Sequence, residues 1–387
     1  MNKNNPPAQQ LHSAASNEID AVIEIRNQIL IDNIEGVIFF CSSHYDLSAL
    51  STAFNSHLDC QIIGCTTAGE ISGEYHNQSL VALVINSDSF VMHSILINNV
   101  KTFNLSKAMK IASDIESQLQ FSSHYKADAM FGFLLTDGLS LKEDKIISMM
   151  HQAMGNINII GGSAGDDLQW NSTYVFHSNA FYNNAATFML LECKDYFDFF
   201  RMQHFEPTDK ELITTDVDFD KHIVNEINGE PAAIAYANIN NLDKDTMNNL
   251  DFSMYPLMLN IANEWYIRSI SYVNPDYSLQ FHCAVDLGLP LRIGTGKNII
   301  QRLQTEIENI ENRFEEIFFT LGCDCILRRL EIINKNYTKN IESLLRRINF
   351  IGFSSYGEQY NGIHFNQTLV AVVVGKKSIS GQTNEQA

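Results

Sequence analysis

Apolar and polar positions in the first half of the chain follow two alternating patterns. Short continuous apolar runs predict buried strands, and apolar residues repeated every three or four positions predict helices with one buried face. Strands that alternate with helices in this way are typical of an α/β fold. The predicted strands span residues 36–41, 61–64, 81–85, 89–97 and 129–136, and the predicted helices span 17–30, 47–54, 105–119 and 142–154.

The second half of the chain has shorter strands and more turn signals. Asn228-Gly229 is typical of a tight hairpin turn, and Pro231 suits the first turn of a helix that continues to residue 237. Alternation predicts a second hairpin around Asn274-Pro275-Asp276. A long helix is predicted from apolar residues on one face, namely Ile299, Ile300, Leu303, Ile307, Ile310, Phe314, Ile317 and Phe318.

One pattern occurs three times along the chain. An apolar strand runs into a glycine turn that ends in an acid, and a polar loop with histidine and asparagine leads to a second apolar strand. Such repetition indicates a fold built from one duplicated unit, with turns that converge on one cavity. The copies occupy residues 62–84, 159–191 and 350–373, and their turns end in Glu70, Asp166 and Glu358.

The distribution of proline divides the chain into two parts. Proline is absent from residues 8 to 206, and five prolines follow from Pro207 to Pro290. A chain of 387 residues is also too long for one ordinary core. We therefore predict two mixed-sheet α/β domains, packed together because no Gly- or Ser-rich linker separates them. The predicted domains span residues 20–197 and 198–377, with flexible tails at 1–19 and 378–387.

The composition excludes several classes of protein. A formal net charge of −19 argues against nucleic acid or an anionic membrane as a partner, since both would repel the chain. The sequence contains neither an apolar run of about 20 residues nor an apolar signal-peptide core. Seven cysteines, an odd number in a chain without an export signal, indicate reduced thiols and a cytoplasmic location.

The repeat turns and three further segments together resemble the FIST sensory family. The resemblance covers roughly residues 20–375 in the family's order, and it implies two α/β domains with a FIST N-terminal and a FIST C-terminal part. It also implies a sensor without an output domain of its own, which passes its signal to a partner in trans. The segments are Gly64–Glu70, Gly161–Asp166, Glu226–Ala232, Tyr255–Leu257, Cys323–Arg329 and Gly352–Val370.

Three shorter segments resemble the branch of haem-binding nitric-oxide sensors called NosP. They are His204–Thr208, Gly322–Glu331 and the stretch from Tyr356 to His364. This resemblance implies haem b as a cofactor, nitric oxide as the ligand, and a histidine kinase or cyclic-di-GMP enzyme as the partner that controls biofilm behaviour. Other FIST proteins resemble small-molecule receptors, so a receptor without haem for a ligand such as an amino acid is the alternative. Self-association is left open.

A haem sensor needs an axial ligand, and histidine is the commonest on a gas-binding iron. His204 lies in an aromatic run near the domain boundary, where Phe205 would line a porphyrin pocket and Arg201 would pair with a propionate. The alternative, a structural histidine bonded to a backbone carbonyl, has equal weight. The next candidates for the iron are His177, His282 and His364.

Cys323 and Cys325 form a C-x-C pair that lacks the second pair of a zinc site. We expect them to be structural residues at the end of the long helix; the alternatives are a ligand to a metal or to the haem iron, and a redox role for the thiols. The following Arg328 and Arg329 are expected to form salt bridges with Glu70 or Glu358.

The glycine turns are a second candidate for a ligand site. Successive backbone N–H groups in such turns can bind an anion, but glycine is also the default residue where a strand reverses sharply, and the two interpretations have equal weight. Because histidines near the domain boundary fit a haem better, we expect the turns to act mainly as a scaffold. The pocket candidates are Gly64, Thr66, Gly69, Glu70, Gly162, Ser163, Asp166, Arg328, Tyr356, Glu358 and Asn366.

Residues 161–165 spell G-x-S-x-G, the nucleophile-elbow pattern of hydrolases. That motif needs a helix directly after the serine, whereas residues 166–172 read as a loop. We therefore expect Ser163 to serve the turn, and we expect no catalytic residue and no enzymatic activity.

Overall fold

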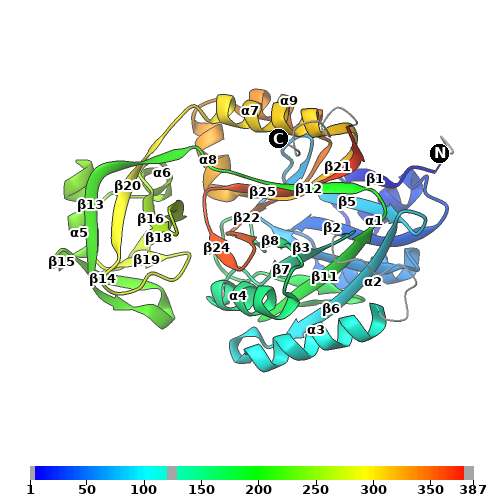
Figure 1. The fold of residues 1–387 in the computed structure, drawn as a ribbon, viewed down its shortest axis with the longest axis horizontal. Coiled ribbons are helices and arrows are strands. Elements are labelled where there is room, and N and C mark those ends of the chain that lie inside the picture. The colour runs from blue at the N-terminus through cyan, green and yellow to red at the C-terminus, as the bar shows by residue number, and fades with distance from the viewer. Residues whose placement is uncertain (1–4, 120–128, 379–387) are drawn as a thin grey trace, which may run out of the picture.

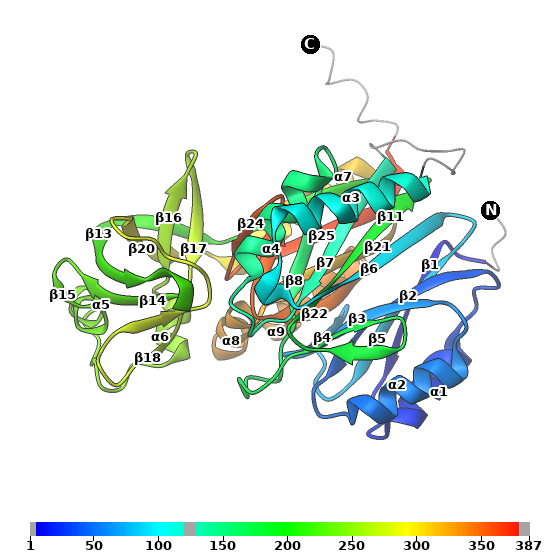
Figure 2. The same ribbon diagram turned by 90° about the horizontal axis from the view of Figure 1, so that it is seen from below.

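The computed structural model describes residues 5–119 and 129–378. It consists of a body built from three β-sheets and a lobe that stands to one side of it in both ribbon views (Figures 1 and 2). The α/β class predicted from the sequence is confirmed. Among the described residues, no helix is both long and apolar enough to cross a membrane.

The three sheets of the body share one strand order. In each sheet the third and fourth strands are parallel and the other neighbours are antiparallel. The first sheet is β1 (Ala8–Ser13), β5 (Leu80–Asn86), β2 (Ile34–Ser42), β3 (Gln61–Thr67), β9 (Val175–His177) and β10 (Ala180–Tyr182). The second sheet is β6 (Phe90–Asn98), β11 (Ala185–Cys193), β7 (Met130–Thr136), β8 (Ile159–Ser163), β23 (Glu358–Tyr360) and β24 (Ile363–Phe365). The third sheet is β12 (Tyr196–Met202), β25 (Leu369–Lys377), β21 (Phe314–Cys325), β22 (Phe350–Ser355) and β4 (Glu70–Ser72).

Each sheet is completed by a segment from a different copy of the repeat. The hairpin β9–β10 of the second copy extends the first sheet, and the hairpin β23–β24 of the third copy extends the second sheet. The strand β4 of the first copy closes the cycle on the third sheet. Each copy therefore contributes strands to the sheet of another copy, and the three contributions form a closed exchange of strands.

Helices cover the outer faces of the sheets, while the inner faces share one core. The helices α1 (Glu18–Gln28) and α2 (Leu47–His57) lie outside the first sheet, as Figure 2 shows. The second sheet is covered by α3 (Leu105–Leu119), which follows the short η1 (Val100–Thr102), and by α4 (Glu143–Met154). The third is covered by α7 (Ile299–Arg313) and α9 (Thr338–Arg347). In the shared core, Phe40 of the first sheet stacks on Phe353 of the third, with ring centroids 4.7 Å apart.

The lobe is a second sheet system with its own core. It is inserted between β12 and α7, so the chain enters the lobe after β12 and returns to the body before α7. The two connecting segments lie side by side, and Lys297 N donates to His204 O at 2.7 Å between them. Its strands run in the order β17 (Glu264–Arg268), β16 (Leu257–Ile261), β20 (Pro290–Gly296), β13 (Phe205–Asp218), β14 (Ile223–Ile227), β19 (Leu279–Phe281) and β18 (Ile270–Val273). Its remaining elements are η3 (Phe219–Lys221), β15 (Glu230–Pro231), α5 (Ala232–Asn240) and α6 (Asn249–Met254).

Two predictions from the sequence are wrong. The long helix ends at Arg313, and Phe314, Ile317 and Phe318 belong to β21. Two bulges in β21, opposite β25, interrupt the alternation of apolar and polar residues, so the apolar residues have a spacing that resembles that of a helix. The tail predicted over residues 1–19 contains β1 and the start of α1. Residues 1–4 and 379–387 of the predicted tails lie outside the described residues. The domain boundary at 197 and 198 stays a prediction, and β12 spans it.

Candidate functional site

The three repeated turns meet at one edge of the body. They follow β3, β8 and β22, and the carboxyl ends of parallel strands are where α/β proteins commonly bind ligands. Backbone hydrogen bonds join each turn to the other two: Gly165 N to Thr66 O at 3.0 Å, Ala68 N to Ser354 O at 3.0 Å, and Ser163 N to Gly357 O at 2.8 Å. The turns thus converge, but they bind one another directly. We call this arrangement the turn ring.

A glycine at the same position of each copy allows the parallel strands to approach. A Cβ atom on Gly64, Gly161 or Gly352 would overlap a carbonyl oxygen of the neighbouring parallel strand. These oxygens belong to Phe39, Leu134 and Gly322. The repeated glycines are therefore required by backbone packing, which is the scaffold role expected for the turns.

Two of the turn acids are buried in the same way. Glu70 accepts hydrogen bonds from Thr67 and from the backbone and side chain of Ser79, and Glu358 accepts them from Ser355 and from the backbone and side chain of Thr368. Burial raises the pKa of Glu70 to about 7 and that of Glu358 to about 8, against the hydrogen bonds that lower both. Both carboxyls are thus poised to hold a proton near neutral pH.

This burial predicts a pH-dependent contribution of Glu358 to stability. At pH values above 4.5, the ordinary pKa, folded Glu358 keeps its proton while the unfolded chain releases it. The contribution of Glu358 to the free energy of unfolding therefore decreases as pH rises, and it is lost once pH has passed the folded pKa of about 8. Between pH 5.5 and 7, the stability of the native protein relative to Glu358→Gln should fall by about 2 kcal/mol. Urea denaturation measures this difference. The exposed control Glu116→Gln should show no comparable slope, and a flat difference for Glu358→Gln would contradict the prediction.

Asp166, the third turn acid, has a different environment. Its carboxylate accepts hydrogen bonds from the backbone N–H groups of Trp170, Asn171 and Ser172 and from the hydroxyl of Tyr356. The strand position that Glu70 and Glu358 occupy in the other copies belongs to Val175 here, as the strand registers show. Asp166 therefore organises an additional loop, residues 166–174, rather than filling the buried acid site.

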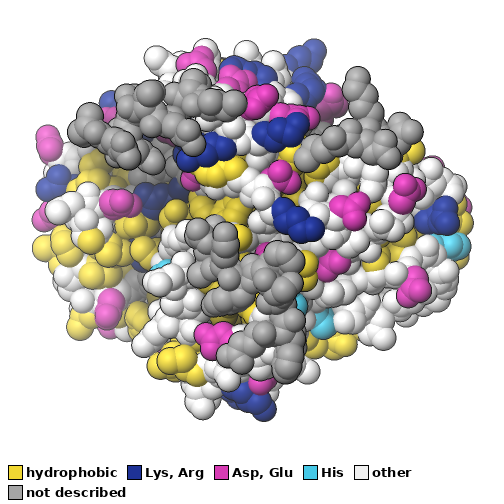
Figure 3. Space-filling model, turned by 45° about the vertical axis from the view of Figure 1, so that its right-hand side comes forward, with side chains coloured by type: hydrophobic (Ala, Val, Ile, Leu, Met, Phe, Trp, Pro, Cys, Tyr) yellow, Lys and Arg dark blue, Asp and Glu magenta, His cyan; other side chains and the backbone are white. Residues whose placement is uncertain are grey.

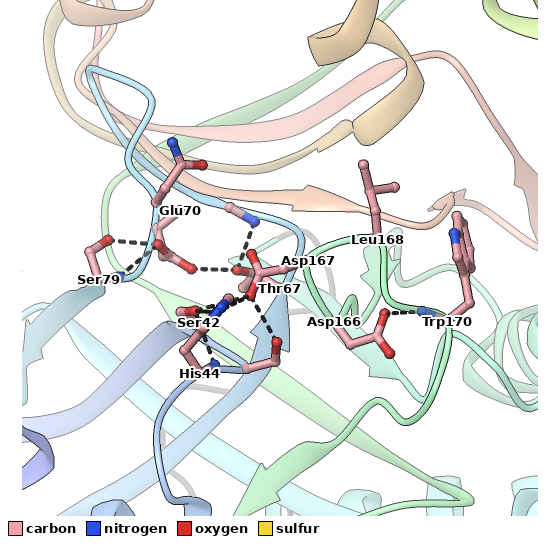
Figure 4. A network of polar contacts seen from close by, with 12 residues as sticks. Ser42, His44, Thr67, Glu70, Ser79, Asp166, Asp167, Leu168 and Trp170 are labelled. Atoms are coloured by element: carbon pink, nitrogen blue, oxygen red, sulfur yellow. Dashed lines mark hydrogen bonds and ion pairs between the residues drawn. The ribbon is translucent and has the colours of Figure 1, made fainter. Parts of the chain in front are cut away.

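This loop spans from the turn ring to the lobe. Asp167 accepts hydrogen bonds from Ser42 and Ser43 at 3.0 and 2.8 Å and lies 3.1 Å from His44 Nδ1, while Asp166 points the other way (Figure 4). Asp167, Leu168 and Trp170 all have positive φ angles of 54° to 63°, a conformation that is costly for residues other than glycine. Such strain is often found at functional sites.

Trp170 connects the body to the lobe. Its ring stacks on Tyr356 with centroids 4.2 Å apart, and it lies 5.1 Å from the ring of His282 in the lobe. The hydroxyl of Tyr356 also donates to Asp166, and Asn366 donates to the carbonyl oxygen of Tyr356. Because the loop contacts both the body and the lobe, a movement of one relative to the other would change the contacts of the loop. No pattern in the sequence identified Asp167 or Trp170, although the extra residues between Asp166 and the next strand are such a signal.

The other turn candidates are enclosed by their neighbours. Ser163 Oγ lies 3.2 Å from Thr136 Oγ1, and a loop rather than a helix follows it. Thr66 Oγ1 accepts a hydrogen bond from Tyr174 N. Gly162 faces Cys323, whose sulfur would lie 2.6 Å from an added Cβ, and Gly69, at φ +127°, lies against the guanidinium of Arg329.

The two arginines do not pair with the turn acids as expected. Arg328 Nε donates to Asp324 at 2.6 Å, and Arg329 donates to Ser354, to Asn77 and to the carbonyl oxygen of His76. Cys323 and Cys325 are buried at the end of β21 rather than at the end of the long helix, and burial raises the pKa of both thiols. Arg328 pairs with Asp324 because Asp324, near the end of β21, lies four residues before Arg328, which is in α8 (Ile326–Asn334).

His204 is hydrogen-bonded to a buried carboxylate, and burial lowers the pKa of its ring. Its Nε2 lies 3.0 and 2.9 Å from the two carboxylate oxygens of Glu331, and both side chains are at most 1% exposed. Arg201 pairs with Glu264 at 2.9 Å and lies over the ring of Tyr266, while Phe205 packs against the His204 ring. A porphyrin iron needs a ring nitrogen that is accessible to it. Here Nε2 is bonded to Glu331, and Nδ1, although it has no partner in the described part of the chain, belongs to a side chain with no exposed surface. The residues around His204 do not fit a haem as they lie.

The remaining histidine candidates lie apart from His204. His177 contacts Ser94 and Ser178 at the edge of the first sheet. His282 and His364 lie where the lobe meets the body, and burial lowers the pKa of both, to about 3 and about 4. Within the described ranges, no three His, Cys, Asp or Glu residues are arranged to hold a metal ion.

The contact between lobe and body, which we call the seam, borders a cavity. Arg268 of the lobe donates to the carbonyl oxygen of His364 at 3.0 Å, and Ala284 N donates to Asp144 of α4 at 3.1 Å. Beside these contacts, a cavity of about 330 Å³ lies between α4 and the lobe. His222 lines it, is 5% exposed, and has no hydrogen-bond partner at Nδ1 among the described residues. A buried polar atom without a partner indicates a missing water or ligand.

Comparison with known proteins identifies the family. The FIST N domain matches residues 36–230 and the FIST C domain matches residues 232–361, so the boundary between the two matches falls within the lobe. None of the curated proteins compared with the chain matches it. Because the FIST N match alone covers half of the chain and the two matches follow in order, the chain belongs to the FIST family, whose domains indicate a sensory role in signal transduction.

Proposed function

We propose that this protein is a sensor of a small ligand that binds in the seam and changes how the lobe sits on the body. The observation that supports this most is the cavity between α4 and the lobe, lined by a buried His222 with an unsatisfied ring nitrogen. Ligands commonly bind where two parts of a protein meet. A ligand that contacts both parts stabilises one arrangement over others, and this is how binding becomes a signal.

Two features support movement of the lobe as the signal. The chain crosses between body and lobe at only one place, next to His204 and Lys297. The strained loop 166–174 contacts the lobe through Trp170 and His282, and its other end is held by the turn ring. A shift of the lobe would therefore change the contacts of the loop and of the turns. A partner in trans, in the cytoplasm, would read this change.

Trp170 offers a direct test, because the chain has only two tryptophans. In a Trp265→Phe variant, all tryptophan emission comes from Trp170, which is stacked between Tyr356 and His282. We expect a ligand found by a thermal-shift screen of small metabolites to change the intensity of this emission. The matched control is Trp170→Phe, in which Trp265 reports and should change little. A ligand that binds by calorimetry but leaves the Trp170 emission unchanged would contradict binding in the seam.

A haem-based nitric-oxide sensor that regulates a histidine kinase and cyclic-di-GMP signalling is the second proposal. It is supported by the three sequence segments that resemble the NosP branch, while the buried hydrogen bond of His204 with Glu331 argues against it. Haem, when bound, would supply the iron that takes up nitric oxide. The residues of this chain that would change are His204 and Glu331, whose pair must break before His204 offers Nε2.

Absorption spectra distinguish the two proposals. If the protein binds haem, purified protein incubated with hemin will show a Soret band that shifts with nitric oxide, and His204→Ala will weaken or move that band. Protein that stays colourless after incubation with hemin, and whose melting temperature is unchanged by it, would end the haem proposal. The seam proposal would be untouched by that result.

A further inference from the structure

The seam cavity is lined by two lysines and two acids, and the lysines are unpaired within the described ranges. Lys142 and Lys145 line it from the start of α4, in a chain of net charge −19. Among the described residues, neither lysine has an ion pair or hydrogen bond at its side-chain nitrogen, whereas Lys221, Lys244, Lys297, Lys335 and Lys376 are each paired with an acid. Two unpaired ammonium groups on one cavity wall favour an anionic occupant.

The acids at the cavity do not cancel this charge. Asp144 accepts a hydrogen bond from Ala284 N and lies 3.8 Å from Arg268, so its charge is already balanced by the seam contacts. Asp220 lies at the exposed rim. His222 lines the cavity from the lobe, and its Nδ1 is buried and has no partner among the described residues. Its backbone has a positive φ of 55°, a conformation that carries a cost for residues other than glycine.

The rest of the cavity wall is apolar. Phe219 of the lobe is 51% exposed and lines the cavity, as does Leu141 at the start of α4. A volume of about 330 Å³ is at the small end of the range for ligand pockets. The wall therefore suits a compact ligand with one anionic end and one apolar part.

We propose that the seam cavity binds a small organic anion, a carboxylate or a phosphate monoester, through Lys142, Lys145 and His222, with its apolar part against Phe219. This inference rests on the proposed function, since it names the ligand class of the same cavity. Charge-assisted hydrogen bonds to two ammonium groups supply the affinity, and the position of His222 on the lobe links occupancy to the seam.

Four probes of one size and different charge test the ligand class. Benzoate, phenyl phosphate, benzamide and benzylamine share a ring for Phe219 and differ only in their polar end. In calorimetry at about 150 mM salt, where long-range charge effects are screened, benzoate or phenyl phosphate should bind, and benzamide and benzylamine should bind at least about tenfold more weakly. Which of the two anions binds more tightly distinguishes a carboxylate from a phosphate ligand.

Matched lysine variants locate the site. Lys142→Gln with Lys145→Gln should weaken anion binding by about tenfold or more, while Lys101→Gln with Lys110→Gln, which makes the same change in net charge on exposed residues, should leave it unchanged. Equal effects of the two pairs would overturn the inference, because binding would then follow net charge alone. His222→Phe should also weaken binding, and circular dichroism checks that each variant is folded.

The outcomes separate this inference from the proposed function. Binding of benzylamine or benzamide in preference to the anions, with a change in Trp170 emission, would overturn the anion class and keep a ligand in the seam. If none of the four probes binds while a metabolite from the screen changes Trp170 emission and keeps its affinity in Lys142→Gln/Lys145→Gln, the anion class is also wrong. If no compound changes Trp170 emission, the seam itself is not the ligand site.

Discussion

Replacing Asp324 with alanine is expected to destabilise the protein by about 3 to 5 kcal/mol, the cost of breaking a buried ion pair from one side. Asp324 and Arg328 are 1% and 0% exposed, and Nε of the arginine lies 2.6 Å from the carboxylate. Tyr75 donates its hydroxyl to the same carboxylate at 2.7 Å. Without Asp324, the buried guanidinium and the tyrosine hydroxyl both lose their acceptor. Urea denaturation followed by circular dichroism measures the loss.

A surface ion pair provides the control for Asp324. Glu311 and Arg347 form a pair whose side chains are 37% and 36% exposed, and exposed pairs contribute at most about 1 kcal/mol. Glu311→Ala should therefore cost far less than Asp324→Ala. Similar losses from the two variants would show that burial of the Asp324–Arg328 pair has no energetic consequence, which would contradict the structure. Asp324→Asn should fall between them, because an amide oxygen still accepts hydrogen bonds.

Replacing Gly161 with alanine is expected to destabilise the protein by about 3 kcal/mol or more, the upper part of the range for overpacking. The new Cβ would overlap the carbonyl oxygen of Leu134 on the adjacent parallel strand, and a backbone atom cannot move aside as a flexible side chain can. Gly352→Ala should behave alike, since it meets the carbonyl oxygen of Gly322 in the equivalent position. Thermal and urea denaturation measure both losses.

Gly296→Ala is the matched control for the repeated glycines. An added Cβ there would lie 3.4 Å from Phe205, an ordinary contact, and its φ angle is not in the left-handed region. We expect a change within about 1 kcal/mol. Equal costs at Gly161 and Gly296 would mean that the strands of the repeat can separate without penalty, and the turn ring would then not need glycine.

Much of the body could be predicted from the sequence because the repeat signals are local. The strands and helices of the first two sheets follow apolar runs and helical spacing, and the Asn228-Gly229 turn has positive φ angles at both residues as its sequence implies. The exchange of strands between copies could not be predicted. Which sheet edge accepts β4 or β23 depends on where the sheets lie in space, and a strand of three residues carries no signal of its partner.

The site was predictable only in part. The turn acids Glu70 and Glu358 were identified from the repeat, but their burial and raised pKa depend on partners that fold around them. His204 has an aromatic neighbourhood in the sequence, and its partner Glu331 lies 127 residues further along the chain, beyond the reach of any local pattern. His222 was missed because its significance comes from the cavity wall, which the lobe and α4 form together.

The closed exchange of strands has a consequence for how the protein is made. A ribosome releases β4 and β8 long before it releases β22 and β23, the strands that pair with them, which begin about 200 to 280 residues later in the chain. Until then the nascent chain carries sheet edges with unpaired backbone groups, and such edges are prone to intermolecular pairing. The body therefore cannot be completed domain by domain during synthesis. Its final closure waits for nearly the last strand, when residues 350–365 leave the exit tunnel.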